Sequence, residues 1–138
     1  MPPKGSPIEA ALERFGRKVI VQARDDTLSS HDAGLKYAKR PAQPTAAAEV
    51  KQRAADYAML ASLSPELRAM VRRLVVEATD AALFYTLKYL DDLEPQLLVD
   101  DQEILKCVRC EIHGLPLTDD GWFARYSKYG EHGDAAVP

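Results

Sequence analysis

Cysteine is scarce in this chain: there are two cysteines among 138 residues, Cys107 and Cys110, in the stretch CVRCEIHG. A disulfide between them would close a very short loop and stabilise little, so the sequence does not predict a small secreted disulfide scaffold. Long apolar runs are missing too. None approaches the roughly 20 residues of a membrane-spanning helix, and the N-terminus lacks the apolar core of a secretory signal. We therefore expect a cytoplasmic protein with no membrane partner.

An excess of basic residues is also absent. The chain has 18 Lys and Arg against 21 Asp and Glu, which gives a formal net charge of −3. Such a balance creates no positive field that would recruit a phosphate backbone, so we expect no nucleic-acid partner. The length suits one domain with its own core and is short for two. We expect a single helical domain over residues 1–138, with flexible ends at about 1–5 and 131–138.

Helical periodicity dominates the first half of the chain. Ser6 begins a capping box, and the apolar residues that follow predict a helix over about 7–24. Thr45 has the side chain of an N-cap for a second helix that ends near Ser62. The intervening segment 25–44 is rich in Asp, Ser, Gly and Pro, which predicts an irregular connection.

The strongest predicted element is one continuous helix from Pro65 to Leu93, with Ser64 as its N-cap. Its apolar positions cover more of the circumference than a surface helix needs, so we expect neighbours on more than one side and a core that includes Leu74. These positions are Leu67, Met70, Val71, Leu74, Ala78, Ala81, Leu83, Tyr85, Leu87 and Leu90. The fold class predicted is mainly α, an irregular single-domain bundle around this long central helix.

The last third of the sequence predicts smaller elements. Residues 97–104 fit either a small β-hairpin or a loop, and a short helix is expected over about 103–113, ending at Gly114. Asp119 or Asp120 is expected to cap a final short helix. Its aromatic side chains are expected to form a lid on the long helix, and they are Trp122, Phe123 and Tyr126.

The stretch CVRCEIHG raises the question of a metal or redox site. Cys107, Cys110 and His113 supply at most three ligands, and no second pair with metal-ligand spacing completes the usual four. The CxxC pair also falls inside a predicted helix, whereas a redox dithiol sits at a helix N-terminus. We therefore expect no cofactor and structural cysteines. A metal- or thiol-dependent protein that uses these three residues is the alternative.

Charged residues recur along the long helix at steps of three and four. They are Arg73, Glu77, Asp80, Lys88 and Asp91. We interpret them as a solvated face with weak charge pairs, because no nucleophile accompanies the carboxylates, and we expect no enzymatic activity. Phe84 shares this stripe. It could anchor a partner, but we favour its being covered by the C-terminal segment.

The segments YTLKYLDD, VDDQE and GWFARYSKYGE resemble small bacterial proteins of toxin-neutralising type, over roughly Leu63 to Glu131. The resemblance implies an intracellular protein-binding module, in its specific form an immunity protein, whose acidic clusters meet a basic toxin surface. The candidate partner-binding residues are Phe84, Asp91, Asp92, Asp100, Asp101, Asp119 and Asp120. A homodimeric structural domain is a further alternative, because it fits the broad apolar surface of the long helix.

Overall fold

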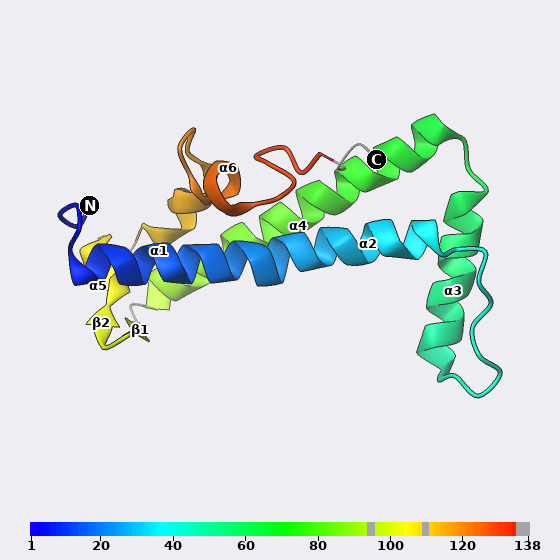
Figure 1. The fold of residues 1–138 in the computed structure, drawn as a ribbon, viewed down its shortest axis with the longest axis horizontal. Coiled ribbons are helices and arrows are strands. Elements are labelled where there is room, and N and C mark those ends of the chain that lie inside the picture. Colours follow the sequence, from blue (N-terminus) through cyan, green and yellow to red (C-terminus); the bar gives the residue numbers. More distant parts are fainter. Residues whose placement is uncertain (94–95, 109–110, 135–138) are drawn as a thin grey trace.

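The computed structural model describes residues 1–93, 96–108 and 111–134 and is mainly helical, as predicted (Figure 1). Its elements in chain order are α1 (Pro7–Val19), η1 (Ile20–Asp25), α2 (Asp26–Lys36), α3 (Ala48–Ala61), α4 (Pro65–Leu93), β1 (Leu98–Val99), β2 (Gln102–Glu103), α5 (Ile104–Cys107), η2 (Ile112–Leu117) and α6 (Trp122–Tyr126). None of the helices in the described part of the chain combines the length and apolar character needed to cross a membrane.

The first helix is longer than the sequence predicts, because α1, η1 and α2 follow one another without a break. The predicted cap is confirmed at its start, where the Ser6 hydroxyl accepts from the Glu9 amide at 3.2 Å. The expected irregular connection over 25–44 is wrong for most of its length. Its polar residues stay helical because Leu28 and His31 are buried, and tertiary packing outweighs weak helix propensity. Thr45 is not the next cap, since Ala47 holds that position without a side-chain hydrogen bond.

A π-helical turn, η1, joins α1 to α2, and the Asp26 amide donates to the carbonyl of Val21, five residues back. This wide turn leaves two consecutive charged residues, Arg24 and Asp25, almost fully buried. Both face the C-terminal segment. Arg24 donates to the carbonyls of Gly130 at 2.7 Å and Glu131 at 2.9 Å.

Arg24 also binds α4. Its guanidinium contacts both carboxylate oxygens of Asp80, at 2.6 and 3.0 Å, and lies 4.0 Å from the centre of the Phe123 ring. Asp25 accepts from the Ser127 hydroxyl and the Lys128 amide. One turn of helix therefore ties α4 and the C-terminal segment to α1 and α2. The expected flexible end at 131–138 begins with backbone that is held in place, and 135–138 lie outside the described residues.

The helix α4 confirms the predicted bounds Pro65 to Leu93. The residues that face inward differ from those expected. The prediction of a solvated charged stripe is wrong at two positions, because Asp80 pairs with buried Arg24 and Asp91 is 4% exposed. Conversely, Leu74, predicted to lie in the core, is 56% exposed. The buried residues of α4 are Val76, Leu83, Leu87 and Asp91.

The second half of the chain builds the main core at one end of the two long helices (Figure 1). The predicted hairpin is confirmed: Leu98 pairs with Glu103 across a turn in which Asp100 and Asp101 have positive φ. The helix expected over 103–113 is wrong. In its place the structure has the short helix α5, and Gly114 lies inside a separate 3-10 turn, η2.

The last short helix, α6, has Gly121 as its N-cap with no side-chain hydrogen bond, so the expected cap by Asp119 or Asp120 is wrong. Its aromatic residues cover α1 and η1, while η2 is the segment that packs most extensively against α4. Trp122 lies edge-on to Phe15 of α1, with ring centroids 6.0 Å apart. The predicted lid therefore exists, but mainly over the first helix.

Candidate protein-binding surface

The solvent side of α4 carries a regular apolar row. Its members recur at alternating steps of four and three residues, which is the heptad spacing of a helix-packing seam. We call this row the α4 seam, and it consists of Leu67, Val71, Leu74, Ala78, Ala81 and Tyr85. Leu67 is 44% exposed, Leu74 56% and Tyr85 67%. A seam that is this exposed presents unpaired helix-packing residues to water.

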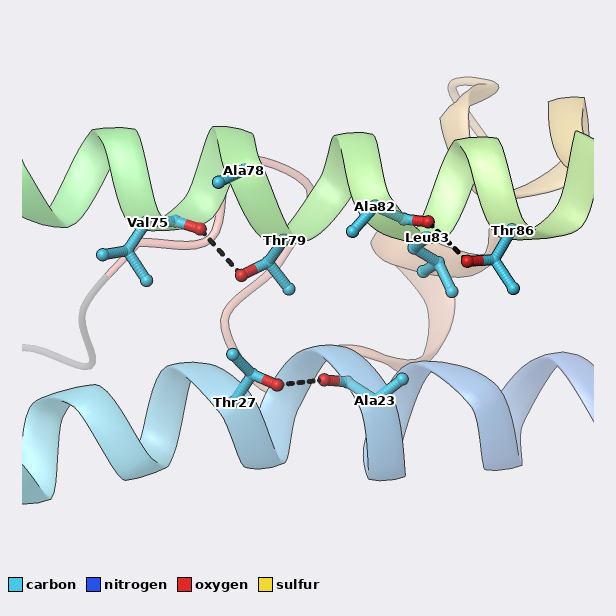
Figure 2. A pocket seen from close by; sticks show the side chains of 8 residues that line it. All are labelled: Ala23, Thr27, Val75, Ala78, Thr79, Ala82, Leu83 and Thr86. Carbon is cyan, nitrogen blue, oxygen red and sulfur yellow. Dashed lines mark hydrogen bonds between the residues drawn. The ribbon is translucent and has the colours of Figure 1, made fainter. Parts of the chain in front are cut away.

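A groove runs beside the seam, between α4 and the first long helix (Figure 2). Its volume is about 510 Å³, and it is lined by Ala23, Thr27, Val75, Ala78, Thr79, Ala82, Leu83 and Thr86. The three threonine hydroxyls donate to carbonyls of their own helices, Thr27 to Ala23, Thr79 to Val75 and Thr86 to Ala82. Figure 2 shows these hydroxyls turned back along each helix.

The groove is apolar because its polar atoms are already paired and no charged residue lines it. Ala78 belongs to both the groove and the seam, so the two form one continuous surface. Small side chains along a helix allow another helix to approach closely and place its larger side chains in the hollow. This surface is therefore suited to packing against a helix rather than to holding a polar ligand.

The total accessible surface of the chain is larger than that of a compact monomer. It measures 9177 Å², whereas a compact monomer of 15.3 kDa exposes about 7,150 Å², roughly 2,000 Å² less. The helix α3 contributes to the difference, since it has no buried residue, and Met59 on it is 72% exposed. Exposed tyrosines near the end of α4 add further apolar surface.

The residues predicted to bind a partner fall on several separate elements. Asp91 is buried, and its carboxylate accepts from the amides of Ile112 and His113, which fixes the start of η2. It therefore shapes the fold instead of presenting an open charge. Phe84 is half-buried, and its ring lies edge-on to that of His113 in η2, with centroids 5.2 Å apart, so the neighbour seen here is η2 and not the C-terminal segment that we favoured.

The other predicted acidic residues are exposed. Asp92 pairs with Lys88 on α4, and Asp100 pairs with Arg14 at 2.7 Å. Asp101 shares the hairpin turn, while Asp119 and Asp120 precede α6. These acidic residues lie on α4, in the hairpin turn and before α6, and their role in binding stays a prediction.

The structure describes the alternative metal site only in part. Cys110 and the side chain of Cys107 lie outside the described residues. The Nδ1 atom of His113 is 2.5 Å from an Asp91 oxygen, so this nitrogen already has a partner. Among the residues that are described, no three His, Cys, Asp or Glu side chains come together as a metal site would require.

A polar hollow of about 420 Å³ lies between α2 and α3 and was not predicted from the sequence. His31 on its wall is 6% exposed, and its Nδ1 lies 3.2 Å from the Tyr57 hydroxyl. Its Nε2 is closed off from solvent and has no hydrogen-bond partner among the described residues. Burial lowers the pKa of His31, although the nearby Asp32 opposes the shift. A neutral imidazole whose free nitrogen does not reach solvent packs the helices and offers no accessible base.

Arg24 is the other residue that sequence reasoning missed, because its partner Asp80 lies 56 positions away. An arginine within an apolar helical face was the only local signal. Comparison of the chain with protein-family models, with curated proteins and with solved structures finds no match.

Proposed function

We propose that this protein is a cytoplasmic protein-binding module and that it binds its partner through the α4 seam and the adjoining groove. The observation that carries the proposal is the seam itself: apolar side chains at heptad spacing, of which Leu67, Leu74 and Tyr85 are 44–67% exposed, beside a groove with no unpaired polar lining. Burying such residues stabilises a complex by about 25 cal/mol per Å² of apolar surface before the cost of association is met.

The charge distribution supports an apolar contact at this site. The exposed carboxylates of Asp100, Asp101, Asp119 and Asp120 lie outside α4, on the hairpin turn and before α6. On α4 itself the exposed charged residues Arg73 and Glu77 flank the seam, so a partner helix would meet apolar side chains at the centre and charged groups at the rim, as in most protein interfaces.

Substitution of one exposed leucine tests this proposal. Wild-type protein, Leu74→Glu and Leu98→Glu are immobilised, and proteins captured from an extract of the source cell are identified and then purified. Leu98 is the matched control, because it is 53% exposed on β1, away from the seam. We expect an identified partner to bind Leu74→Glu at least tenfold more weakly than wild type and to bind Leu98→Glu as wild type, measured by calorimetry.

Equal affinity of all three proteins for that partner would refute the proposed surface. Circular dichroism of each variant must first show an unchanged helix content, which the high exposure of both leucines leads us to expect.

A toxin-neutralising role is the more specific form of the proposal. It is supported by the resemblance of Leu63 to Glu131 to immunity-type proteins and by exposed acidic pairs that suit a basic toxin surface. A toxin-like reading frame beside the gene is the expected observation. Its product should bind the wild-type protein and lose affinity when Asp119 and Asp120 are both replaced by Asn.

A further inference from the structure

We infer that the partner on the α4 seam is a second copy of this chain, and that two α4 helices pack antiparallel about a two-fold axis midway between Leu74 and Ala78. This inference rests on the proposed function, because it names the occupant of the same surface. Two independent features carry it: the area that the chain leaves exposed, and the order of large and small side chains along the seam.

The exposed area fits an obligate dimer. The chain shows roughly 2,000 Å² more surface than a compact monomer of its mass, while obligate homodimers bury about 1,000–2,500 Å² per subunit. A foreign partner of standard size would cover only about 800 Å². Part of the excess belongs to α3, which has no buried residue, and a second copy that lies along all of α4 accounts for the part that α4 exposes.

The seam is complementary to itself when its direction is reversed. With the axis midway between Leu74 and Ala78, residues whose numbers are equally far above and below 76 face each other. Leu74 then faces Ala78 and Val71 faces Ala81, in each case a large side chain against a small one. Leu67 faces Tyr85 at each end. Alternation of large and small residues across an interface is what dense helix packing requires.

The groove takes part in the same arrangement. Ala78 lines the groove, so the partner's Leu74 side chain would lie at the edge of a hollow of about 510 Å³ whose other lining residues are alanine, threonine, valine and leucine. Antiparallel neighbours also align their helix dipoles favourably, whereas a parallel pair would not. The product is a bundle of four long helices, two from each copy.

Sedimentation velocity tests the second copy directly. From about 1 to 100 μM, wild-type protein should have twice the 15.3 kDa mass of the chain, and so should Leu98→Glu, the control. Leu74→Glu and Ala78→Glu should each have the mass of one chain. Ala78→Glu is the second variant because an exposed alanine carries no core packing, so its fold survives if that of Leu74→Glu does not.

A charge exchange tests the orientation. Leu67→Glu and Tyr85→Lys, at positions 44% and 67% exposed, should each weaken the dimer at least tenfold. Combined in one chain, they should restore it, because each new glutamate faces a new lysine in the antiparallel pair. In a parallel pair like charges would meet, so a double variant that stays dissociated overturns the antiparallel arrangement.

The remaining outcomes separate this inference from the proposed function. A wild-type protein that is monomeric at 100 μM overturns the second copy. The proposed function is then tested separately, by whether Leu74→Glu loses affinity for an identified foreign partner. A wild-type dimer that persists in Leu74→Glu and Ala78→Glu places the contact elsewhere and overturns the inference. If the wild type is monomeric and Leu74→Glu loses no partner, both are refuted.

Discussion

Replacing Arg24 by Met should destabilise the protein strongly, because one fully buried guanidinium holds three parts of the fold together. Arg24 is 0% exposed and binds Asp80 of α4 as well as the carbonyls of Gly130 and Glu131. Methionine fills much of the same space but donates no hydrogen bond. The variant leaves a carboxylate and two carbonyls without their donor, and removal of one partner from a buried ion pair costs about 3–5 kcal/mol.

The lower end of that range applies here, because the Asp80 side chain is 21% exposed and water can hydrate part of it. A loss of about 3 kcal/mol lowers the melting temperature of a chain of this size by roughly 10 °C. Urea unfolding followed by circular dichroism measures the free energy of unfolding, and a thermal scan measures the midpoint. Asp80→Asn, which keeps an oxygen acceptor for Arg24, should fall between wild type and Arg24→Met.

The control is a second arginine in an ion pair of opposite character. Arg14 pairs with Asp100 at 2.7 Å, and their side chains are 63% and 54% exposed. Exposed pairs contribute about 0–1 kcal/mol, so Arg14→Met should change stability little. Equal losses for Arg24→Met and Arg14→Met would refute the reasoning that burial sets the cost.

Three smaller changes should also be measurable. Gly16→Ala should cost about 1–3 kcal/mol in urea unfolding, because its Cβ would overlap the indole ring of α6, whereas Gly114→Ala, with open space around it, should be near neutral. Asp91→Ala should cost about 1–3 kcal/mol by leaving buried amides of η2 unpaired. Burial lowers the pKa of His31 in the folded protein below the unfolded value of 6.5. The unfolded chain therefore binds more protons below about pH 6.5, so the free energy of unfolding should fall as the pH drops from about 6.5 toward the folded pKa. His31→Phe should show a smaller fall.

Local signals predicted the longest element well. A capping serine, a proline at the first position and a long apolar arc fixed both ends of α4 from neighbouring residues alone. The hairpin at Leu98 to Glu103 was one of two interpretations, and the Asp100-Asp101 turn decides it, because both residues adopt positive φ. The sequence therefore predicts best the elements whose determining residues are close together in the chain.

Long-range contacts explain the errors. Segment 26–36 is polar enough to read as a loop, but Leu28 packs against Val76 of α4, a contact that no local pattern encodes. Asp80 and Asp91 looked solvated because a helix that is apolar on several sides does not reveal which side faces the core. Their partners, Arg24 and the amides of η2, lie 21 to 56 positions away.

The proposed binding surface belongs to an apolar arc of α4 that is visible in the sequence. This arc is wider than one core contact needs, which predicts a second packing face. Leu74 was placed inside the domain, whereas the structure leaves it exposed on the seam. An apolar helix position predicts burial, and only the fold shows whether the chain itself supplies that burial.

The π turn at Ile20–Asp25 sets the rotational phase between the two halves of the first long helix. A π-helix closes its hydrogen bonds one residue further along than an α-helix, so the turn holds one extra residue while the helix beyond it keeps about the phase of a continuous α-helix. Leu28 therefore packs with Val76 of α4 while Ala11 and Leu12 lie in the main core. Deleting exposed Gln22 should let an ordinary α-helix run through with both clusters in place, whereas deleting a residue of α1 or α2 would turn everything beyond it by about 100°.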